Sequence, residues 1–202
     1  MPKVSEAHLA ARREQIIDAA MRRFVENGFQ ATGMADVIAE TGMSAGAVYR
    51  YFKSKDELIE AIVDRVLGHV AERFTELLRA ESVPDPAAAV RAGVEAFEAM
   101  VADASVDVGR LAIQAWAEAL RNDRIAATVT HAYSTIRGYY VEVSRRAIDG
   151  GTAPADADAG ELGSALYSLM AGFVLQRVLI GGVDTESYSR GVSGLLDGRL
   201  RH

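Results

Sequence analysis

The 202-residue chain contains no cysteine, which excludes disulfide bonds, thiolate metal sites and a thiol nucleophile. Its four histidines form no pair at the spacing of metal ligands, so we predict neither a metal site nor a cofactor. No apolar segment approaches the roughly 20 residues that span a bilayer, and the polar residues 1–14 show no apolar core like that of a signal peptide. We therefore expect a cytoplasmic protein without a membrane partner.

The chain also lacks an excess of positive charge. Its net charge of −6 argues mildly against a nucleic-acid partner. Its distribution is more informative. Residues 1–55 hold eight Lys and Arg against six Asp and Glu, a net charge of +2, whereas residues 56–202 hold 14 basic and 22 acidic residues, a net charge of −8. The positive charge is thus concentrated in the first quarter of the chain. This excess is small, and on its own it is weak evidence for DNA binding.

Strand patterns are missing as well, and most of the chain shows the apolar periodicity of helices. We predict an all-α fold of about nine helices. They are expected to cover approximately residues 8–26, 34–41, 45–52, 55–78, 86–102, 106–120, 123–149, 159–180 and 186–196.

Capping signals mark several of the predicted helix ends. Gly28 and Gly42 can adopt the left-handed conformation that ends a helix. Ser44 is a suitable N-cap for the third helix, and residues 54–57 form the Ser-x-x-Glu pattern of a capping box at the start of the fourth. Asp158 is the expected cap of the eighth helix.

Residues 28–58 contain two short helices joined by a tight glycine turn, which is the form of a helix-turn-helix. The second helix of such a motif can enter the major groove of DNA. Its small residues Ala45, Gly46 and Ala47 would let the backbone approach base edges closely. The same segment supplies side chains that can reach phosphates or bases, namely Tyr49, Arg50, Tyr51, Lys53 and Lys55.

This segment resembles the N-terminal domain of TetR-type transcriptional regulators. The matching residues are Gly28-Phe29, Thr32, Ile38-Ala39, Gly42, Ser44, Gly46, Tyr49, Tyr51-Phe52, Lys55 and Leu58, with Ile16-Ile17, Ala19-Ala20 and Phe24 in the first helix. The resemblance implies a three-helix DNA-binding domain over residues 1–54, with its helix-turn-helix at about 33–52. It further implies a helical effector-binding and dimerisation domain over residues 55–202.

The resemblance also implies roles for single residues of the DNA-binding domain. The base-facing residues of the recognition helix would be Ser44, Ala45, Gly46, Ala47 and Arg50, and the phosphate contacts would be Thr32, Tyr49, Tyr51 and Lys55. Val48 and Phe52 would face inward. One position departs from the family, which usually has a hydroxyl residue where this chain has Gly33. Only a backbone N–H can bind phosphate there.

The fifth to eighth helices carry side chains compatible with either a hydrophobic core or the lining of an effector pocket. The resemblance favours a pocket, and it would suit a largely apolar effector. The candidate lining residues are Phe97, Met100, Gln114, Trp116, Glu118, Tyr133, Tyr140, Tyr167, Met170, Phe173 and Gln176.

The eighth predicted helix is apolar nearly all round, which is typical of a helix that is buried on more than one side. One of those sides can belong to a second subunit. The resemblance to the family implies a homodimer that forms through the eighth and ninth helices.

Taken together, the resemblance implies a repressor that binds double-stranded operator DNA, is released by a small-molecule effector, and is not an enzyme. Two alternatives to this repressor function remain open. Residues 42–46 match Gly-x-Ser-x-Gly, the nucleophile elbow of serine hydrolases, although that motif follows a strand and Ser44 follows a predicted helix. The other alternative is a helical carrier of apolar ligands that does not bind DNA.

Overall fold

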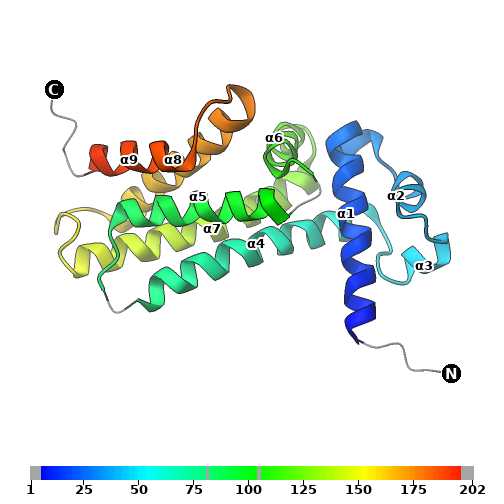
Figure 1. The fold of residues 1–202 in the computed structure, drawn as a ribbon, viewed down its shortest axis with the longest axis horizontal. Helices are drawn as coiled ribbons and strands as arrows, with labels where there is room; N and C mark the ends of the chain where they lie inside the picture. The colour runs from blue at the N-terminus through cyan, green and yellow to red at the C-terminus, as the bar shows by residue number, and fades with distance from the viewer. Residues whose placement is uncertain (1–5, 81, 104–105, 197–202) are drawn as a thin grey trace. The chain divides into compact units, whose positions relative to one another are not determined.

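The computed structural model describes residues 6–80, 82–103 and 106–196, and within these ranges every regular element is a helix (Figure 1). The all-α prediction is confirmed, and nine helices lie in the described part of the chain. They are α1 (Glu6–Ala31), α2 (Met34–Thr41), α3 (Ala45–Tyr49), α4 (Lys55–Arg79), α5 (Pro86–Asp103), α6 (Val108–Ala119), α7 (Asp123–Asp149), α8 (Ala159–Leu179) and α9 (Thr185–Leu196).

The helix ends near the N-terminus follow the predicted capping residues. Gly28 interrupts α1 with a φ of 79°, and Gly42 ends α2 with a φ of 65°. The Ser44 hydroxyl caps α3 by accepting a hydrogen bond from the Ala47 N–H. Helix α3 is shorter than predicted, because the N–H groups of Tyr51 and Phe52 both donate to the Val48 carbonyl and close a turn there. Residues 45–52, called the recognition segment below, therefore consist of α3 and the turn that follows it.

The predicted capping box at the start of α4 is only half formed. The Glu57 N–H donates to the Ser54 hydroxyl over 3.2 Å, as expected. The Glu57 carboxylate, however, accepts from the N–H of Lys53 over 2.6 Å instead of from that of Ser54. The bond shifted by one residue ties the end of the recognition segment to the first turn of α4.

The chain divides into two compact units. The first comprises residues 1–65 together with 103–129, and the second comprises residues 66–102 together with 130–202. Helices α4 and α7 contribute residues to both units, and α6 belongs to the same unit as α1 to α3. The domain boundary after residue 54 stays a prediction, because these units reflect packing within the chain and not the division of functions.

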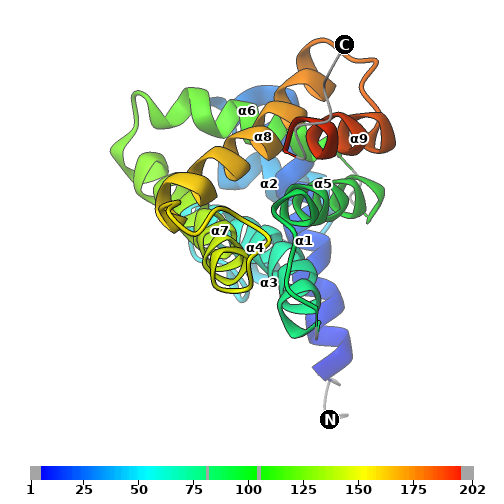
Figure 2. The same ribbon diagram turned by 90° about the vertical axis from the view of Figure 1, so that its left-hand side faces the viewer.

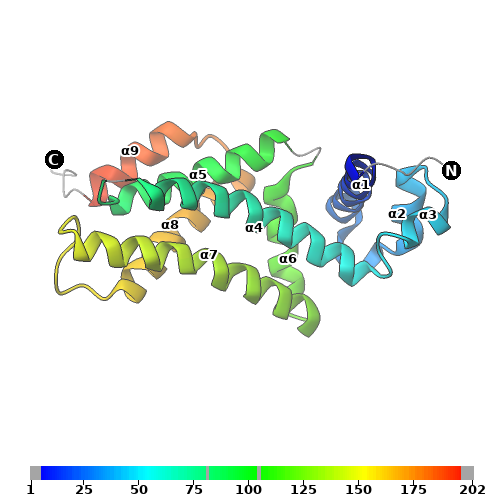
Figure 3. The same cartoon turned by 90° about the horizontal axis from the view of Figure 1, so that it is seen from below.

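In the first unit, α2 and α3 lie together on one side of α1 (Figures 1 and 3). The buried stripe of α1 includes Ile16, Ile17 and Phe24, and the Phe24 ring stacks on that of Phe29 with 4.7 Å between centroids. The other large apolar side chains buried in this unit include Val37, Val48, Phe52, Leu58, Ile62, Val108, Leu111 and Ile125. Burial of these side chains supplies most of the stabilisation, as in other small helical units.

The second unit contains the end of α4 together with α5, α7, α8 and α9 (Figure 2). The Phe74 ring of α4 contacts the Tyr139 and Tyr140 rings of α7. Helix α9 is tied to α8 by a hydrogen bond from the Tyr188 hydroxyl to the Leu169 carbonyl. The large apolar side chains buried here include Val70, Phe74, Val90, Val94, Phe97, Ile136, Tyr140, Val143, Leu166 and Phe173.

Helix α8 keeps much of its apolar surface exposed. Leu179 and Ile180, at and just beyond its end, are 67% and 79% exposed, and Leu175 is exposed as well. By length and composition alone, α8 is also apolar enough to cross a membrane, which differs from the expectation that no segment is. One side of α8, with Leu166 and Phe173, is buried in the second unit. No helix among the described residues covers the side with Leu175 and Leu179.

Candidate nucleic-acid interface

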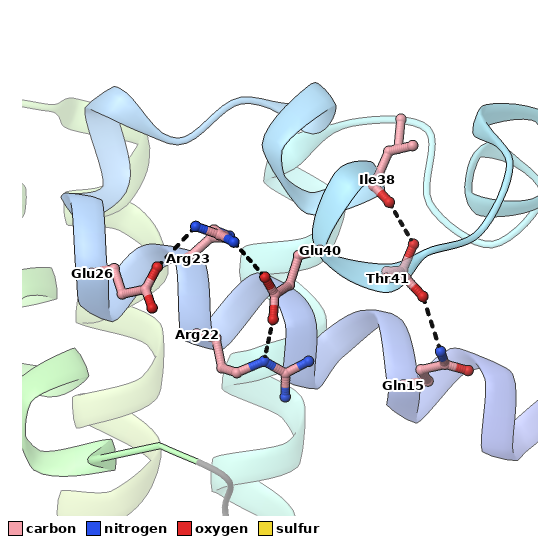
Figure 4. Close-up of polar contacts among 7 residues, drawn as sticks. All are labelled: Gln15, Arg22, Arg23, Glu26, Ile38, Glu40 and Thr41. Carbon is pink, nitrogen blue, oxygen red and sulfur yellow. Dashed lines mark hydrogen bonds and ion pairs between the residues drawn. The ribbon is translucent and has the colours of Figure 1, made fainter.

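An ion-pair network fixes α2 against α1 (Figure 4). One carboxylate oxygen of Glu40 accepts from Arg22 Nε over 2.6 Å, and the other accepts from Arg23 Nη2 over 2.5 Å. Arg23 also donates to Glu26 over 2.9 Å. Hydrogen bonds from Arg22 and then Arg23 lower the pKa of Glu40, and the bond to Glu40 raises the pKa of Arg23. Glu40 therefore remains charged and holds both arginines.

A second set of polar contacts fixes the turn between α2 and α3 (Figure 4). Gln15 of α1 donates to the Thr41 carbonyl over 3.2 Å. The Thr41 hydroxyl donates to the Ile38 carbonyl and accepts from the Met43 N–H. Since Gly42 supplies the left-handed turn, α3 starts from a position set by both neighbouring helices.

Helix α3 has one buried and one exposed face. Val48 and Phe52 are buried, as predicted for the inward face, and the Arg13 guanidinium lies over the Phe52 ring at 5.1 Å. The opposite face is solvent-exposed at Ser44, Ala45, Gly46, Arg50 and Lys53, and Tyr49 is 41% exposed. Ala47 and Tyr51 are half-buried. The segment thus presents small residues, a phenol and cations to solvent together.

The basic side chains in and after α3 differ in whether they form hydrogen bonds or ion pairs within the chain. Among the described residues Arg50 forms no ion pair, and its side chain is exposed. The ammonium of Lys55 donates to the Phe29 carbonyl over 2.8 Å, and that of Lys53 donates to the Tyr49 carbonyl. Both lysines thus place their ammonium groups beside α3 and stabilise the turns around it.

Thr32 and Gly33 form the start of α2. The Thr32 side chain is fully buried, and its hydroxyl lies 2.9 Å from the Gly28 carbonyl and 3.0 Å from that of Arg23. It therefore does not present its hydroxyl to a phosphate, and only its backbone can. The Gly33 N–H donates to the Asp36 carboxylate over 2.7 Å. A negative charge thus occupies the helix end where a phosphate would dock.

Gln114 and Glu118 of α6 face α1, which sequence reasoning did not foresee. Gln114 donates to the Val25 carbonyl over 3.0 Å, and the buried Glu118 carboxylate accepts from Gln30 over 2.8 Å. Arg124, at the start of α7, pairs with Asp56 of α4. Partners 68 to 89 residues apart in sequence leave no local signal, so only the fold could reveal these contacts.

Two family models match the chain. The model described as bacterial regulatory proteins, tetR family, matches residues 16–62. The model described as BetI-type transcriptional repressor, C-terminal, matches residues 86–201, which is more than half of the chain. The chain belongs to the TetR family.

Curated relatives match the N-terminal part of this TetR-family chain. It is 48% identical over 62 residues to the HTH-type transcriptional repressor Rv1474c of Mycobacterium tuberculosis, covering 31% of the chain and 33% of the relative. It is 36% identical over 95 residues to the HTH-type transcriptional regulator BetI of Yersinia pestis, covering 47% of each. The chain therefore spans between a third and about half of the length of these relatives.

Solved structures of the family match over nearly the whole TetR-family chain. Salmonella enterica GusR superposes with a TM-score of 0.76 at 27% identity, covering 98% of this chain and 99% of its own. A transcriptional regulator from Saccharomonospora viridis in complex with choline superposes with a TM-score of 0.68 at 20% identity, covering 93% and 96%. The latter likeness concerns the fold alone.

The predicted pocket residues of this TetR-family chain are divided between the two compact units. Phe97, Met100, Tyr133, Tyr140, Tyr167, Met170 and Phe173 belong to the second unit, whereas Gln114, Trp116 and Glu118 belong to the first. Gln176 is exposed, so its prediction as a lining residue is wrong for this structure. Its α8 position had suggested an inward side chain, because nearly every neighbour is apolar.

The serine-nucleophile interpretation of Ser44 lacks its structural context. Ser44 follows helix α2 and caps helix α3, whereas a nucleophile elbow joins a strand to a helix. Its hydroxyl oxygen accepts the Ala47 N–H over 3.3 Å, the ordinary role of an N-cap serine. The relatives are named as transcriptional regulators. Nothing in the geometry supports hydrolysis at this residue.

Proposed function

We propose that this TetR-family chain is a homodimeric, DNA-binding transcriptional repressor that a small, largely apolar ligand releases from its operator. The observation that carries the proposal is the exposed face of α3. It combines small residues with Arg50, which forms no ion pair among the described residues, on a helix that follows the Gly42 turn directly after α2, and the Glu40 network fixes α2 to α1. A regulator of bacterial DNA would act in the cytoplasm.

The proposed contacts divide into two sets. Base edges in the major groove would meet Ser44, Ala45, Gly46, Ala47 and Arg50, because small side chains permit close approach and arginine can bind guanine through two hydrogen bonds. Phosphates would meet Tyr49, Tyr51, Lys53 and Lys55 together with backbone N–H groups near Thr32 and Gly33, where the Gly33 N–H is shared with the Asp36 carboxylate. The second set would fix the register of the protein on DNA without reading its sequence.

The proposed dimerisation through α8 and α9 is supported by their exposed apolar side chains. Leu175, Leu179, Ile180, Leu195 and Leu196 are all exposed in the single chain. A second copy of this surface would bury them, since two-fold dimers bring the same patch of each subunit together. Such a dimer would place two α3 helices in successive major grooves, roughly 34 Å apart, on a palindromic operator.

Release by a ligand requires two conformations with different affinities for DNA. A ligand that prefers the conformation unsuited to DNA lowers DNA affinity by the ratio of its own affinities for the two states. Helix α4 is the proposed lever, because it begins beside the recognition segment and continues into the second unit.

The test is binding of the purified protein to the intergenic DNA upstream of its own gene, with salt titration and excess nonspecific competitor. We expect binding that survives competitor and weakens steeply with salt. Arg50→Ala should lose sequence preference, whereas Tyr49→Ala should weaken binding to all sequences alike. If neither this DNA nor a random-sequence selection yields a bound site, the proposal is wrong.

A further inference from the structure

We infer that the hydroxyls of Tyr140 and Ser144 are the polar contact for an uncharged hydroxyl or carbonyl group of the effector. The inference rests on the ligand-responsive part of the proposed function and gives that ligand a chemical class. It would be an aromatic or otherwise apolar molecule that carries one uncharged hydrogen-bonding group.

Both hydroxyls are buried and unpaired. Tyr140 and Ser144 lie one turn apart on α7, so their side chains share a face of the helix, and both residues are fully buried. Neither oxygen has a hydrogen-bond partner in the described structure. Burying an unpaired hydroxyl opposes folding, so folded proteins seldom leave two such groups on one face of a helix without a use for them.

The Tyr140 hydroxyl is held in place by its neighbours. A side-chain carbon at Gly93 of α5 would lie 1.9 Å from the hydroxyl oxygen, so only glycine leaves room for it. The Tyr140 ring contacts Phe74 at 4.8 Å and Tyr167 at 6.0 Å between centroids. Met170 borders the same spot, with its Cγ 2.9 Å from that carbon position. Methionine is unbranched and flexible, and it can move aside for a ligand.

The surroundings favour an uncharged ligand group. Burial raises the pKa values of Tyr140 and Tyr167, so both phenols stay neutral and act only through hydrogen bonds. The charged residues that link α5 to α8, Glu98 and Arg177, already pair with each other at 3.2 Å. An anion or cation brought to Tyr140 would therefore lack an opposite charge, whereas a hydroxyl or carbonyl would find a donor and an acceptor.

The first measurement is the Tm of the ligand-free protein in Tyr140→Phe and Ser144→Ala. Each variant deletes one oxygen and keeps the remaining shape. A hydroxyl without a partner should be dispensable, so we expect the Tm to stay unchanged or to rise. A fall in Tm for either variant would mean that its hydroxyl already has a structural partner, such as a buried water, and would overturn the inference.

The second measurement compares two probes of similar shape, 2-naphthol and 2-methylnaphthalene, by equilibrium binding without DNA. We expect the wild type to prefer 2-naphthol by about tenfold, the effect of a well-made buried hydrogen bond. Tyr140→Phe and Ser144→Ala should each reduce that preference and leave 2-methylnaphthalene binding unchanged. Tyr139→Phe, whose ring stacks on Phe74 from the neighbouring position, is the matched control and should behave as wild type.

Equal binding of the two probes, or no binding of either, would overturn the inference. So would tight binding of choline that Tyr140→Phe leaves unchanged, because aromatic faces recognise a quaternary ammonium without hydroxyls. DNA is absent from these assays. Failure of the proposed operator binding would therefore leave the probe preference intact, and the two failures are distinguishable.

Discussion

At the scale of single residues, Glu40 contributes more to the DNA-binding unit than its exposed neighbours. It accepts hydrogen bonds from two arginines of α1 and thereby decides how α2 sits on that helix. Those two arginines are among the eight basic residues that suggested a cationic N-terminal segment. Because Glu40 neutralises part of their charge, the cationic face near α3 depends mainly on Arg50, Lys53 and Lys55.

Glu40→Gln should flatten the acid dependence of stability. The pKa of Glu40 is lowered in the folded state, so its contribution is complete above the ordinary glutamate pKa of about 4.3 and is lost as the pH falls through the lower folded value. Urea unfolding at a series of pH values should show a smaller slope across that window in the variant. Glu60→Gln, at an exposed position of α4, is the control. Equal slopes in the wild type and Glu40→Gln would contradict this role.

Asp36→Ala should strengthen DNA binding. The substitution removes a negative charge from the first turn of α2 and frees the Gly33 N–H for a phosphate oxygen. We expect affinity for nonspecific duplex DNA to rise by roughly threefold to tenfold, with some loss of helix capping. Asp64→Ala on α4 controls for the change in net charge. Weaker binding in Asp36→Ala would show that the capped helix start matters more than the exposed N–H.

At the scale of elements, the polar contacts of α6 hold the end of α1. The Glu118 carboxylate receives the Gln30 amide, and Gln114 satisfies a carbonyl in the last full turn before Gly28. Glu118→Ala should lower the free energy of unfolding by about 1–2 kcal/mol, because it removes a buried hydrogen-bond acceptor. Denaturant unfolding of the two single variants Glu118→Ala and Gln30→Ala and of the double variant measures the coupling. Additive effects would show that the bond contributes nothing.

The elements also show how far sequence reasoning reaches. The stops at Gly28 and Gly42 and the Ser44 cap could be predicted, because each depends on a few neighbouring residues. The contact of Glu118 with Gln30 could not, because a polar residue on an amphipathic helix does not indicate which distant partner it meets. The sequence could not show for a related reason that the Thr32 hydroxyl is unavailable to a phosphate. That hydroxyl bonds to backbone carbonyls that come near it only in the folded chain.

At the scale of the whole molecule, the exposed leucines of α8 and α9 support the proposed dimer. Leu179→Lys should weaken the proposed dimer by about tenfold or more, since it puts a charge in both subunits where that dimer would bury an apolar side chain. Sedimentation over a range of protein concentrations measures the change. Leu120→Lys is the matched control, because Leu120 is 90% exposed at the end of α6 in the other unit. An unchanged dimer in Leu179→Lys would place the interface elsewhere.

The close approach of Tyr140 to Gly93 also constrains how this chain can diverge. A methyl group at position 93 collides with the phenolic oxygen at 1.9 Å, but it would lie 3.2 Å from the ring carbon that carries that oxygen. Loss of the hydroxyl by Tyr140→Phe therefore removes the shortest of these contacts and leaves the flexible Met170 side chain, whose Cγ would lie 2.9 Å away, to move aside for Gly93→Ala. Gly93→Ala in the presence of the phenol is blocked. Once alanine is fixed, tyrosine cannot return without restoring glycine. The two substitutions can therefore accumulate in one order only, and they can be reversed only in the opposite order.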